Sequence, residues 1–215
     1  MTAFADRRAA GRALAGRLAG LAGPDPVILA LPRGGLPVAD EVARALGAPL
    51  DIVLVRKIGM PGNPELALGA IAGPGSATMV LNEELVRLYG IDRDTIEAQA
   101  APQRAELERR RRLWGGRLAP GALKGRTVVL VDDGIATGAT MRAAIAAVRA
   151  DGPARVVVAA PVAPPEVAAA MEALADRVVC LATPRQFTAV GLHYASFPQL
   201  EDDEVRRILD GARRT

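Results

Sequence analysis

The sequence predicts an α/β fold in which a mainly parallel sheet is flanked by helices. Short apolar runs alternate with amphipathic segments along the 215 residues, and this repetition of strand and helix is typical of a parallel sheet with helical crossovers. Hydrophobic residues make up 50% and charged residues 24% of the chain, which is the composition of a protein that buries a core. A chain of this length is expected to form a single domain over residues 1–215.

The composition also excludes several classes of protein. The 27 lysines and arginines against 24 acidic residues give a formal net charge of +3, which favours anionic ligands but falls short of a dedicated nucleic-acid binder. No apolar stretch reaches the roughly 20 residues that span a bilayer, so we expect no membrane segment. Cys180 is the only cysteine, which excludes an internal disulfide and fits a reducing, cytoplasmic compartment. His193 is the only histidine, so a histidine-rich metal site is excluded.

The N-terminal part of the chain predicts helix, strand, helix and strand in this order. The N-terminus is rich in arginine and alanine like a targeting peptide, but the spacing of its apolar residues predicts an ordinary amphipathic helix over 4–21. The apolar runs 27–31 and 51–56 predict strands. Residues 38–46 between them predict a helix that ends at Gly47.

The next segment is less regular. Residues 59–75 are rich in glycine and proline and are too interrupted for a regular helix. Within it, residues 67–72 could form one strand of a loose hairpin, with 77–81 as the partner strand.

The rest of the chain returns to alternation after a polar stretch. Residues 82–113 are helix-prone, with expected breaks at 90–92 and at Pro102, and the basic run within 104–117 is typical of a solvated helix face. Strands are then expected at 126–131, 155–160 and 177–181, and helices at 140–149, 165–175 and 201–214.

The stretch VVLVDDGIATGAT, residues 128–140, carries the clearest functional signal. The most apolar predicted strand ends in two adjacent carboxylates, Asp132 and Asp133, and ligands of parallel sheets bind beyond the carboxyl ends of the strands. Residues 134–140 provide small side chains and hydroxyls directly ahead of a helix, and the backbone N–H groups of such a turn bind phosphate. A phosphate cradle beside carboxylates that accept hydrogen bonds from hydroxyls implies a phosphorylated sugar.

This stretch resembles the phosphoribosyl-pyrophosphate motif of type I phosphoribosyltransferases. It lacks the Gly-Lys-Ser/Thr ending of a nucleotide P-loop, and the alternative is a strand, turn and helix whose acids have no such role. The resemblance implies a Rossmann-like parallel sheet with a mobile loop, a helical insertion at about 82–124 and a small C-terminal hood at about 183–200. The overall pattern is similar to predicted bacterial phosphoribosyltransferases related to the purine enzymes.

Two further stretches carry the resemblance. Residues 29–47 are similar to the pyrophosphate loop of purine phosphoribosyltransferases, in which Arg33, Gly34 and Gly35 would bind the leaving group and the Pro32–Arg33 peptide bond would be cis. Glycines in such a turn let the backbone approach a pyrophosphate closely.

The stretch VRKIGMPGNPE, residues 55–65, resembles adenine phosphoribosyltransferases, although its spacing after Gly59 differs by one residue. The resemblance implies that Arg56 and Lys57 bind phosphoribosyl pyrophosphate. The segment 60–75 would be the mobile loop that closes over the reaction.

A last stretch, residues 183–197, is similar to the hood of hypoxanthine-guanine enzymes, where a phenylalanine stacks on the base. The resemblance implies that Phe187 binds the acceptor, and the alternative is that Phe187 is a core residue.

The resemblance implies transfer of the 5-phosphoribosyl group from phosphoribosyl pyrophosphate to a small nitrogen acceptor, with release of pyrophosphate. Asp132 and Asp133 would be catalytic, and would hold the ribose hydroxyls directly or through Mg²⁺. The binding site for the 5′-phosphate would consist of Ala136, Thr137, Gly138, Ala139 and Thr140.

The acceptor is less well defined. In hypoxanthine-guanine enzymes an aspartate that contacts the purine precedes the Thr-Gly pair, but here the residue is Ala136, as in adenine enzymes. Glu65 is therefore our candidate for the catalytic acid–base residue. A non-catalytic regulator that binds phosphoribosyl pyrophosphate is the alternative function, since it needs the same motif. We also expect a homodimer.

Overall fold

The computed structural model describes residues 4–20, 23–73, 78–114, 116, 118–119 and 121–212, apart from the side chains of residues 64 and 65. Its strands are β1 (Pro26–Ala30), β2 (Leu50–Ile52), β3 (Leu54–Met60), β4 (Asn63–Gly73), β5 (Thr78–Leu81), β6 (Thr127–Val131), β7 (Arg155–Val162) and β8 (Arg177–Ala182). Its helices are α1 (Arg7–Leu18), α2 (Gly35–Leu46), α3 (Glu83–Leu88), α4 (Arg93–Trp114), α5 (Ala139–Ala150), α6 (Pro165–Glu172), α7 (Asp202–Ala212) and a 3₁₀ turn, η1 (Val190–His193).

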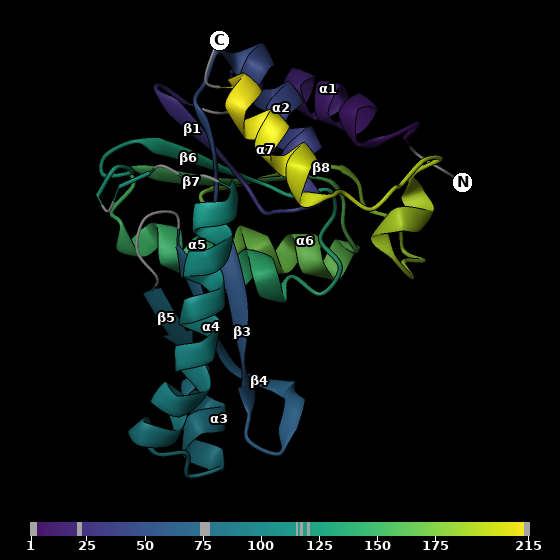
Figure 1. The fold of residues 1–215 in the computed structure, drawn as a ribbon. Coiled ribbons are helices and arrows are strands. Elements are labelled where there is room, and N and C mark those ends of the chain that lie inside the picture. The colour runs from purple at the N-terminus through teal and green to yellow at the C-terminus, as the bar shows by residue number, and fades with distance from the viewer. Residues whose placement is uncertain are drawn as a thin grey trace.

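The core is a five-stranded parallel sheet in the order β2-β1-β6-β7-β8, which confirms the predicted fold class. Helices α1, α2 and α7 cover one face, and α5 and α6 cover the other (Figure 1). The alternation of side chains along β6 explains this sandwich: Val129 and Val131 pack toward the first layer, whereas Val128 and Leu130 pack toward the second.

The central position of β6 fixes where a ligand can bind. All five residues of β6 are buried, and Val131 lies level with Ala30 of β1 and Ala159 of β7. The segments that follow these parallel strands therefore meet at one edge of the sheet, which is the edge where parallel sheets bind ligands.

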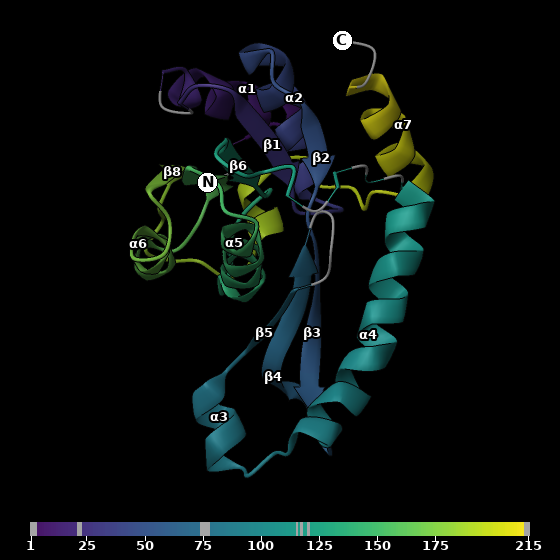
Figure 2. The ribbon, with the colours of Figure 1, turned by 90° about the vertical axis from the view of Figure 1, so that its left-hand side faces the viewer.

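The predicted strand 51–56 is divided between two sheets. β2 ends at Ile52 in the parallel sheet, Val53 is buried, and β3 begins a three-stranded antiparallel sheet in the order β3-β4-β5. Figure 2 shows this second sheet extending away from the core, with α4 along one side and α3 near its far end. We call β3, β4, β5, α3 and α4 the arm.

The described residues of 59–75 form no helix, as expected, and most of them belong to a hairpin of β3 and β4. The predicted pairing of 67–72 with 77–81 is confirmed by the register of β4 and β5, in which Ala72 lies opposite Thr78. A Cβ on Gly69 would lie 3.0 Å from the Cα of Leu81, so the glycine allows close approach of β5. Gly69 therefore serves strand packing, whereas Gly62 has a φ of +76° in the turn between β3 and β4.

The arm contacts α5 of the core through small side chains. Ala72 of β4 is buried against Ala143 and Ala147 of α5, and Val55 and Ala70 pack beside them. On the other side of the arm, α4 runs without interruption through Pro102, contrary to the expected break there. The expected break at 90–92 is confirmed between α3 and α4. None of the described helices is both long enough and apolar enough to cross a membrane.

The N-terminal helix is confirmed but is shorter than expected. Asp6 caps it by accepting a hydrogen bond from the backbone N–H of Ala9 at 2.7 Å. Phe4 precedes the cap and is not part of the helix; it forms an isolated parallel bridge with Tyr194.

Candidate active site

The two acids at the end of β6 differ in their surroundings. The Asp133 carboxylate is buried, and its Oδ2 accepts a hydrogen bond from Nε of Arg7 at 2.8 Å. The Asp132 side chain is only partly buried, and its Oδ1 accepts from the backbone N–H of Asp133 at 2.9 Å. Asp132 therefore retains some contact with solvent as a residue, although protein atoms surround its carboxyl group.

Both carboxyl groups resist ionisation in this setting. Burial, followed by the negative charge of Asp133, raises the pKa of Asp132 well above its ordinary value. Burial also raises the pKa of Asp133, although Arg7 opposes this shift. A positive charge placed beside these acids would stabilise their ionised forms, so the site favours a cationic species at this point.

The segment after the acids forms an open turn at the start of α5. Gly138 directly precedes the first helical residue and has a φ of +78°. Glycine adopts this left-handed conformation more readily than other residues. Thr137 and Thr140 are exposed on either side of it. The first N–H groups of a helix lack partners within the helix and bind anions, so this turn can hold a phosphate.

The turn after β1 packs directly on the acids. The Pro32–Arg33 peptide bond is cis, as the resemblance implied. A Cβ on Gly34 would lie 2.7 Å from Cγ of Asp133, and one on Gly35 would lie 2.9 Å from the Cα of Asp132. The structure therefore brings the two motifs together, and the glycines make room for the carboxylates.

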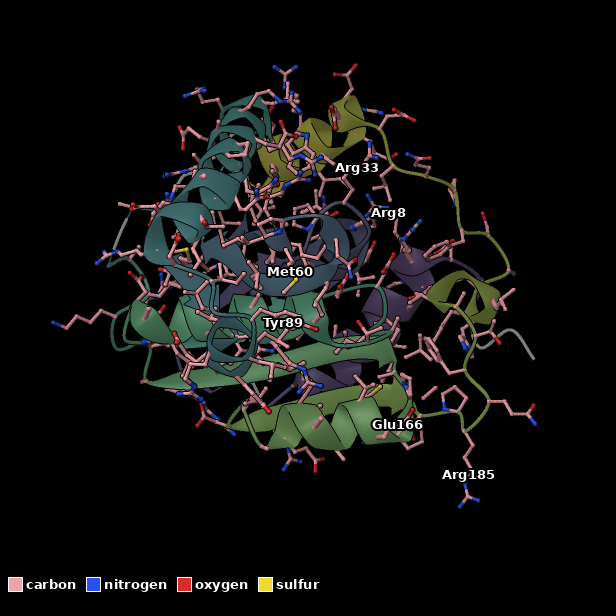
Figure 3. All side chains as sticks on the ribbon, turned by 90° about the horizontal axis from the view of Figure 1, so that it is seen from below. Arg8, Arg33, Met60, Tyr89, Glu166 and Arg185 are labelled. Carbon is pink, nitrogen blue, oxygen red and sulfur yellow. The ribbon has the colours of Figure 1, made fainter. Side chains whose placement is uncertain are left out.

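The predicted cations occupy the rim of this region. Arg33 lies beside the start of α7 (Figure 3), with Nη1 3.7 Å from Oδ1 of Asp202. Arg56 donates from Nε to Oε1 of Gln103 in α4 at 3.2 Å. A small cavity of about 30 Å³ is lined by Arg56 together with Pro32 and Thr140, among other residues.

Lys57 faces the other side of β3. It lines a cavity of about 380 Å³ between the arm and α5, together with Thr140 and Arg142. Thr140 lies on both this cavity and the smaller one, so the turn at the start of α5 adjoins both predicted cations. The side chain of Glu65 lies outside the described part of the chain.

The predicted hood covers the turn after β6. A Cβ on Gly134 would lie 2.5 Å from Cγ1 of Val190, so the hood residue Val190 packs directly on this glycine. The Phe187 ring stacks on His193 within the hood, with centroids 5.1 Å apart and an angle of 23° between the planes. Phe187 is partly buried there.

Sequence reasoning missed two residues of this site, Arg7 and Tyr194. The Tyr194 hydroxyl donates to the backbone carbonyl of Asp133 at 2.5 Å, and burial raises the pKa of Tyr194, which keeps the hydroxyl protonated. A signal for Arg7 was present, because Arg7 precedes Leu14 and Leu18 at the spacing of the buried face of α1. A charged residue on such a face needs a buried partner.

Known proteins are similar to this chain over most of its length. A family model described as a phosphoribosyl transferase domain matches residues 4–196. A Mycobacterium tuberculosis (strain H37Rv) protein named "Putative phosphoribosyl transferase" is 50% identical over 214 residues, covering 100% of this chain and 48% of that protein. The chain therefore spans about half the length of the curated relatives it matches.

Solved structures were compared in the same way. TT1426 from Thermus thermophilus is 51% identical, with a TM-score of 0.83 over 96% of this chain and 97% of that chain. The purine phosphoribosyltransferase from Pyrococcus horikoshii is 21% identical, with a TM-score of 0.45 over 89% of this chain and 90% of that chain.

Proposed function

Because this chain belongs to the phosphoribosyl transferase family, we propose that it transfers a 5-phosphoribosyl group from phosphoribosyl pyrophosphate to a nucleobase-like nitrogen acceptor. The observation that carries the proposal is the pair of acids at the end of β6, followed directly by an open turn at the start of α5. In the reaction, the C1′–N bond forms, the C1′–O bond to pyrophosphate breaks, and the acceptor nitrogen loses a proton.

The turn at the start of α5 would hold the 5′-phosphate. Its backbone N–H groups and the exposed hydroxyls of Thr137 and Thr140 supply hydrogen-bond donors, and the positive end of the helix dipole adds to their effect. Ala136 and Ala139 are exposed at the same turn and leave space for the phosphate. Holding this remote group fixes the sugar relative to the acids, which lowers the entropic part of the barrier.

The two acids would act on the ribose. Asp132 and Asp133 can accept hydrogen bonds from the 2′ and 3′ hydroxyls, and their negative charge stabilises the positive charge that develops on the ring as the bond to pyrophosphate breaks. The raised pKa of Asp132 fits this role, because burial and a like charge make a neighbouring cation favourable.

The leaving pyrophosphate would be bound by Arg33, Lys57 and the backbone of Gly34 and Gly35, with Arg56 nearby. Arg33 is partly exposed and its contact with Asp202 is 3.7 Å long, so turning toward a pyrophosphate costs little. Arginine suits this task because its planar guanidinium can bind phosphate oxygens in a bidentate manner.

The carboxylates of Asp132 and Asp133 are hard oxygen donors of the kind that Mg²⁺ prefers. Among the described residues, no group of three or more metal-binding side chains occurs, which fits an ion bound largely by pyrophosphate, ribose hydroxyls and water. Asp132, whose carboxyl group has no ion-pair partner such as Arg7 within hydrogen-bond distance among the contacts described above, would hold it from the protein side. When bound, the ion would supply neutralising charge for the pyrophosphate.

The acceptor would be a planar nitrogen heterocycle under the hood. Phe187 would stack on it, and Glu65 would take the proton from the attacking nitrogen. The position of the hood supports this assignment, since Val190 packs on Gly134 in the turn that follows the acids.

The test is release of pyrophosphate from phosphoribosyl pyrophosphate with Mg²⁺ across a panel of nitrogen bases. With the base that supports release, Asp132→Asn should lower turnover at least ~100-fold, the size of a lost electrostatic contact in the transition state. Glu166→Gln, an exposed change in the first turn of α6, should leave turnover unchanged.

Binding of phosphoribosyl pyrophosphate without release for any base would favour the non-catalytic regulator. Absence of both binding and release would refute the proposal.

A further inference from the structure

The N-terminal segment and the hood lie side by side although they are far apart in the sequence. The backbones of Phe4 and Ala5 exchange hydrogen bonds of 2.9 to 3.1 Å with residues 193–196. The Phe4 ring lies 5.5 Å from that of Tyr194, which in turn lies 5.0 Å from Phe197. This pairing places the start of α1 against the hood.

Arg7, in the first turn of α1, joins three parts of the molecule. Its Nε donates to Oδ2 of Asp133 at 2.8 Å, and its Nη1 donates to the backbone carbonyl of Pro198 at 2.7 Å. Its Cζ lies 3.6 Å from the centroid of the Phe197 ring. The side chains of Arg7 and Asp133 are only 9% and 12% exposed, so water screens this pair weakly.

Asp133 is held at its main chain as well as at its carboxylate. The Tyr194 hydroxyl in the hood donates to the backbone carbonyl of Asp133. Gly34, in the turn after β1, lies against the Asp133 carboxylate. The hood therefore contacts Asp133 directly through Tyr194 and indirectly through Phe197, Pro198 and Arg7.

We propose that Arg7 is a positioning residue, which fixes the Asp133 carboxylate toward the ribose and holds the hood against the same acid. The inference rests on the proposed function. It explains how the hood, on the acceptor side, and Asp133, on the sugar side, stay at a fixed distance from each other, because the Arg7 guanidinium contacts both.

The chemistry of arginine is needed for this arrangement. The planar guanidinium directs Nε and Nη1 to two different acceptors while its flat face rests on an aromatic ring. Lysine carries a single ammonium and cannot reproduce all three contacts. Arg7→Lys should therefore retain the charge but lose part of the positioning.

A purely structural role is the competing explanation. Buried ion pairs contribute little net stability compared with well-packed apolar residues, but removing one partner is strongly destabilising. The loss of stability in an Arg7 variant therefore cannot separate the two explanations, and ligand binding in folded variants has to be measured.

The experiment measures the dissociation constant of phosphoribosyl pyrophosphate with Mg²⁺ by calorimetry, and pyrophosphate release with the accepted base. The proteins are wild type, Arg7→Gln, Asp133→Asn and the double variant, each well below its own unfolding temperature. Loss of a side chain that orients a ligating group typically costs about 10–100-fold, which is the expected loss for Arg7→Gln.

If Arg7 acts through Asp133, the two substitutions are not additive, and Arg7→Gln should cost less than about twofold in the Asp133→Asn background. The affinity and turnover of Arg7→Lys should lie between those of wild type and Arg7→Gln. Arg7→Lys replaces Arg7→Gln in the experiment if Arg7→Gln does not fold. Arg12→Gln is the matched control, because Arg12 lies on the same helix and is mostly exposed, with a 3.5 Å contact to Glu41. It should behave as wild type.

The inference would be overturned if Arg7→Gln bound phosphoribosyl pyrophosphate and released pyrophosphate like Arg12→Gln. It would also be overturned if Arg7→Gln lost the same factor in affinity in the wild-type and Asp133→Asn backgrounds. These outcomes differ from a failure of the proposed function, in which wild type itself would neither bind phosphoribosyl pyrophosphate nor release pyrophosphate. That last result would overturn both.

Discussion

Adding one methyl group to Gly34 tests the contact between the two motifs of the site. The new Cβ would lie 2.7 Å from Cγ and 3.0 Å from Oδ1 of Asp133. Gly34 has φ −58° and ψ −39°, which alanine adopts without strain, so the backbone conformation is not the obstacle. The obstacle is a carboxylate that Arg7 holds in place.

The expected cost follows from the ways in which the clash can be relieved. If the turn and the acid shift slightly apart, the penalty is that of an overpacked core, about 1–3 kcal/mol. If the carboxylate instead leaves Arg7, the penalty rises toward the ~3–5 kcal/mol of a broken buried pair. Alanine returns ~0.4–1 kcal/mol by restricting the unfolded chain. Taking the midpoints of these ranges, the net loss for Gly34→Ala is about 1.3 kcal/mol if the turn shifts and about 3.3 kcal/mol if the carboxylate leaves Arg7, so we expect a net loss of about 1–3 kcal/mol.

Urea unfolding of Gly34→Ala and Gly16→Ala measures this difference. Gly16 lies inside α1 with no atom within 4 Å of its added Cβ, so its alanine variant should gain about 0.5–1 kcal/mol. In a domain of this size, a loss of 1 kcal/mol lowers Tm by about 2–4 °C, so thermal melts should show opposite shifts. Equal stability of Gly34→Ala and wild type would refute the reasoning about this contact.

Three further outcomes are expected. Burial and the charge of Asp133 raise the folded-state pKa of Asp132 above its unfolded value, so the stability of wild type falls as pH rises between these two pKa values. Asp132→Asn should therefore have a higher Tm than wild type at pH 7. A difference in Tm that does not disappear below the unfolded pKa would contradict this. Phe187→Leu should weaken acceptor binding by the ~0.5–1.5 kcal/mol of a lost stacking contact, with Tm and phosphoribosyl-pyrophosphate binding nearly unchanged, whereas a core role would lower Tm and affect both ligands alike. The amides of residues 60–73 should become more protected from hydrogen exchange when phosphoribosyl pyrophosphate and an acceptor analogue are bound together, and equal protection in both states would exclude closure of this hairpin.

The parallel core was predictable because its strands are continuous apolar runs that are buried on both faces. β6 and β7 are the clearest examples, since all residues of β6 and all but the first of β7 are buried. The break expected at Pro102 failed because long-range packing outweighed a local preference. Ile96, Ala100, Leu107 and Trp114 form a buried face along α4, and Trp114 also donates to Asp202 of α7 at 3.0 Å.

The site was predictable where one segment carries its chemistry, and less so where distant segments meet. Consecutive residues in the sequence are enough to recognise Asp132, Asp133 and the turn that follows them. The contact of Gly34 with Asp133 requires β1 and β6 to be neighbours, which local pattern does not specify. Arg7 is separated from Asp133 by 126 positions, and only its place on an apolar helix face indicated a buried partner.

The buried part of the contact between the arm and α5 consists of alanines, and this has a mechanical consequence. Alanine side chains have no branches that interlock, so two such surfaces resist separation but offer little resistance to shear. A displacement along this seam would carry Lys57 of β3 past Thr140 at the start of α5, since both line the cavity between the arm and the helix. Such a displacement would change the distance between the charge that would bind a leaving pyrophosphate and the hydroxyl that would bind a 5′-phosphate.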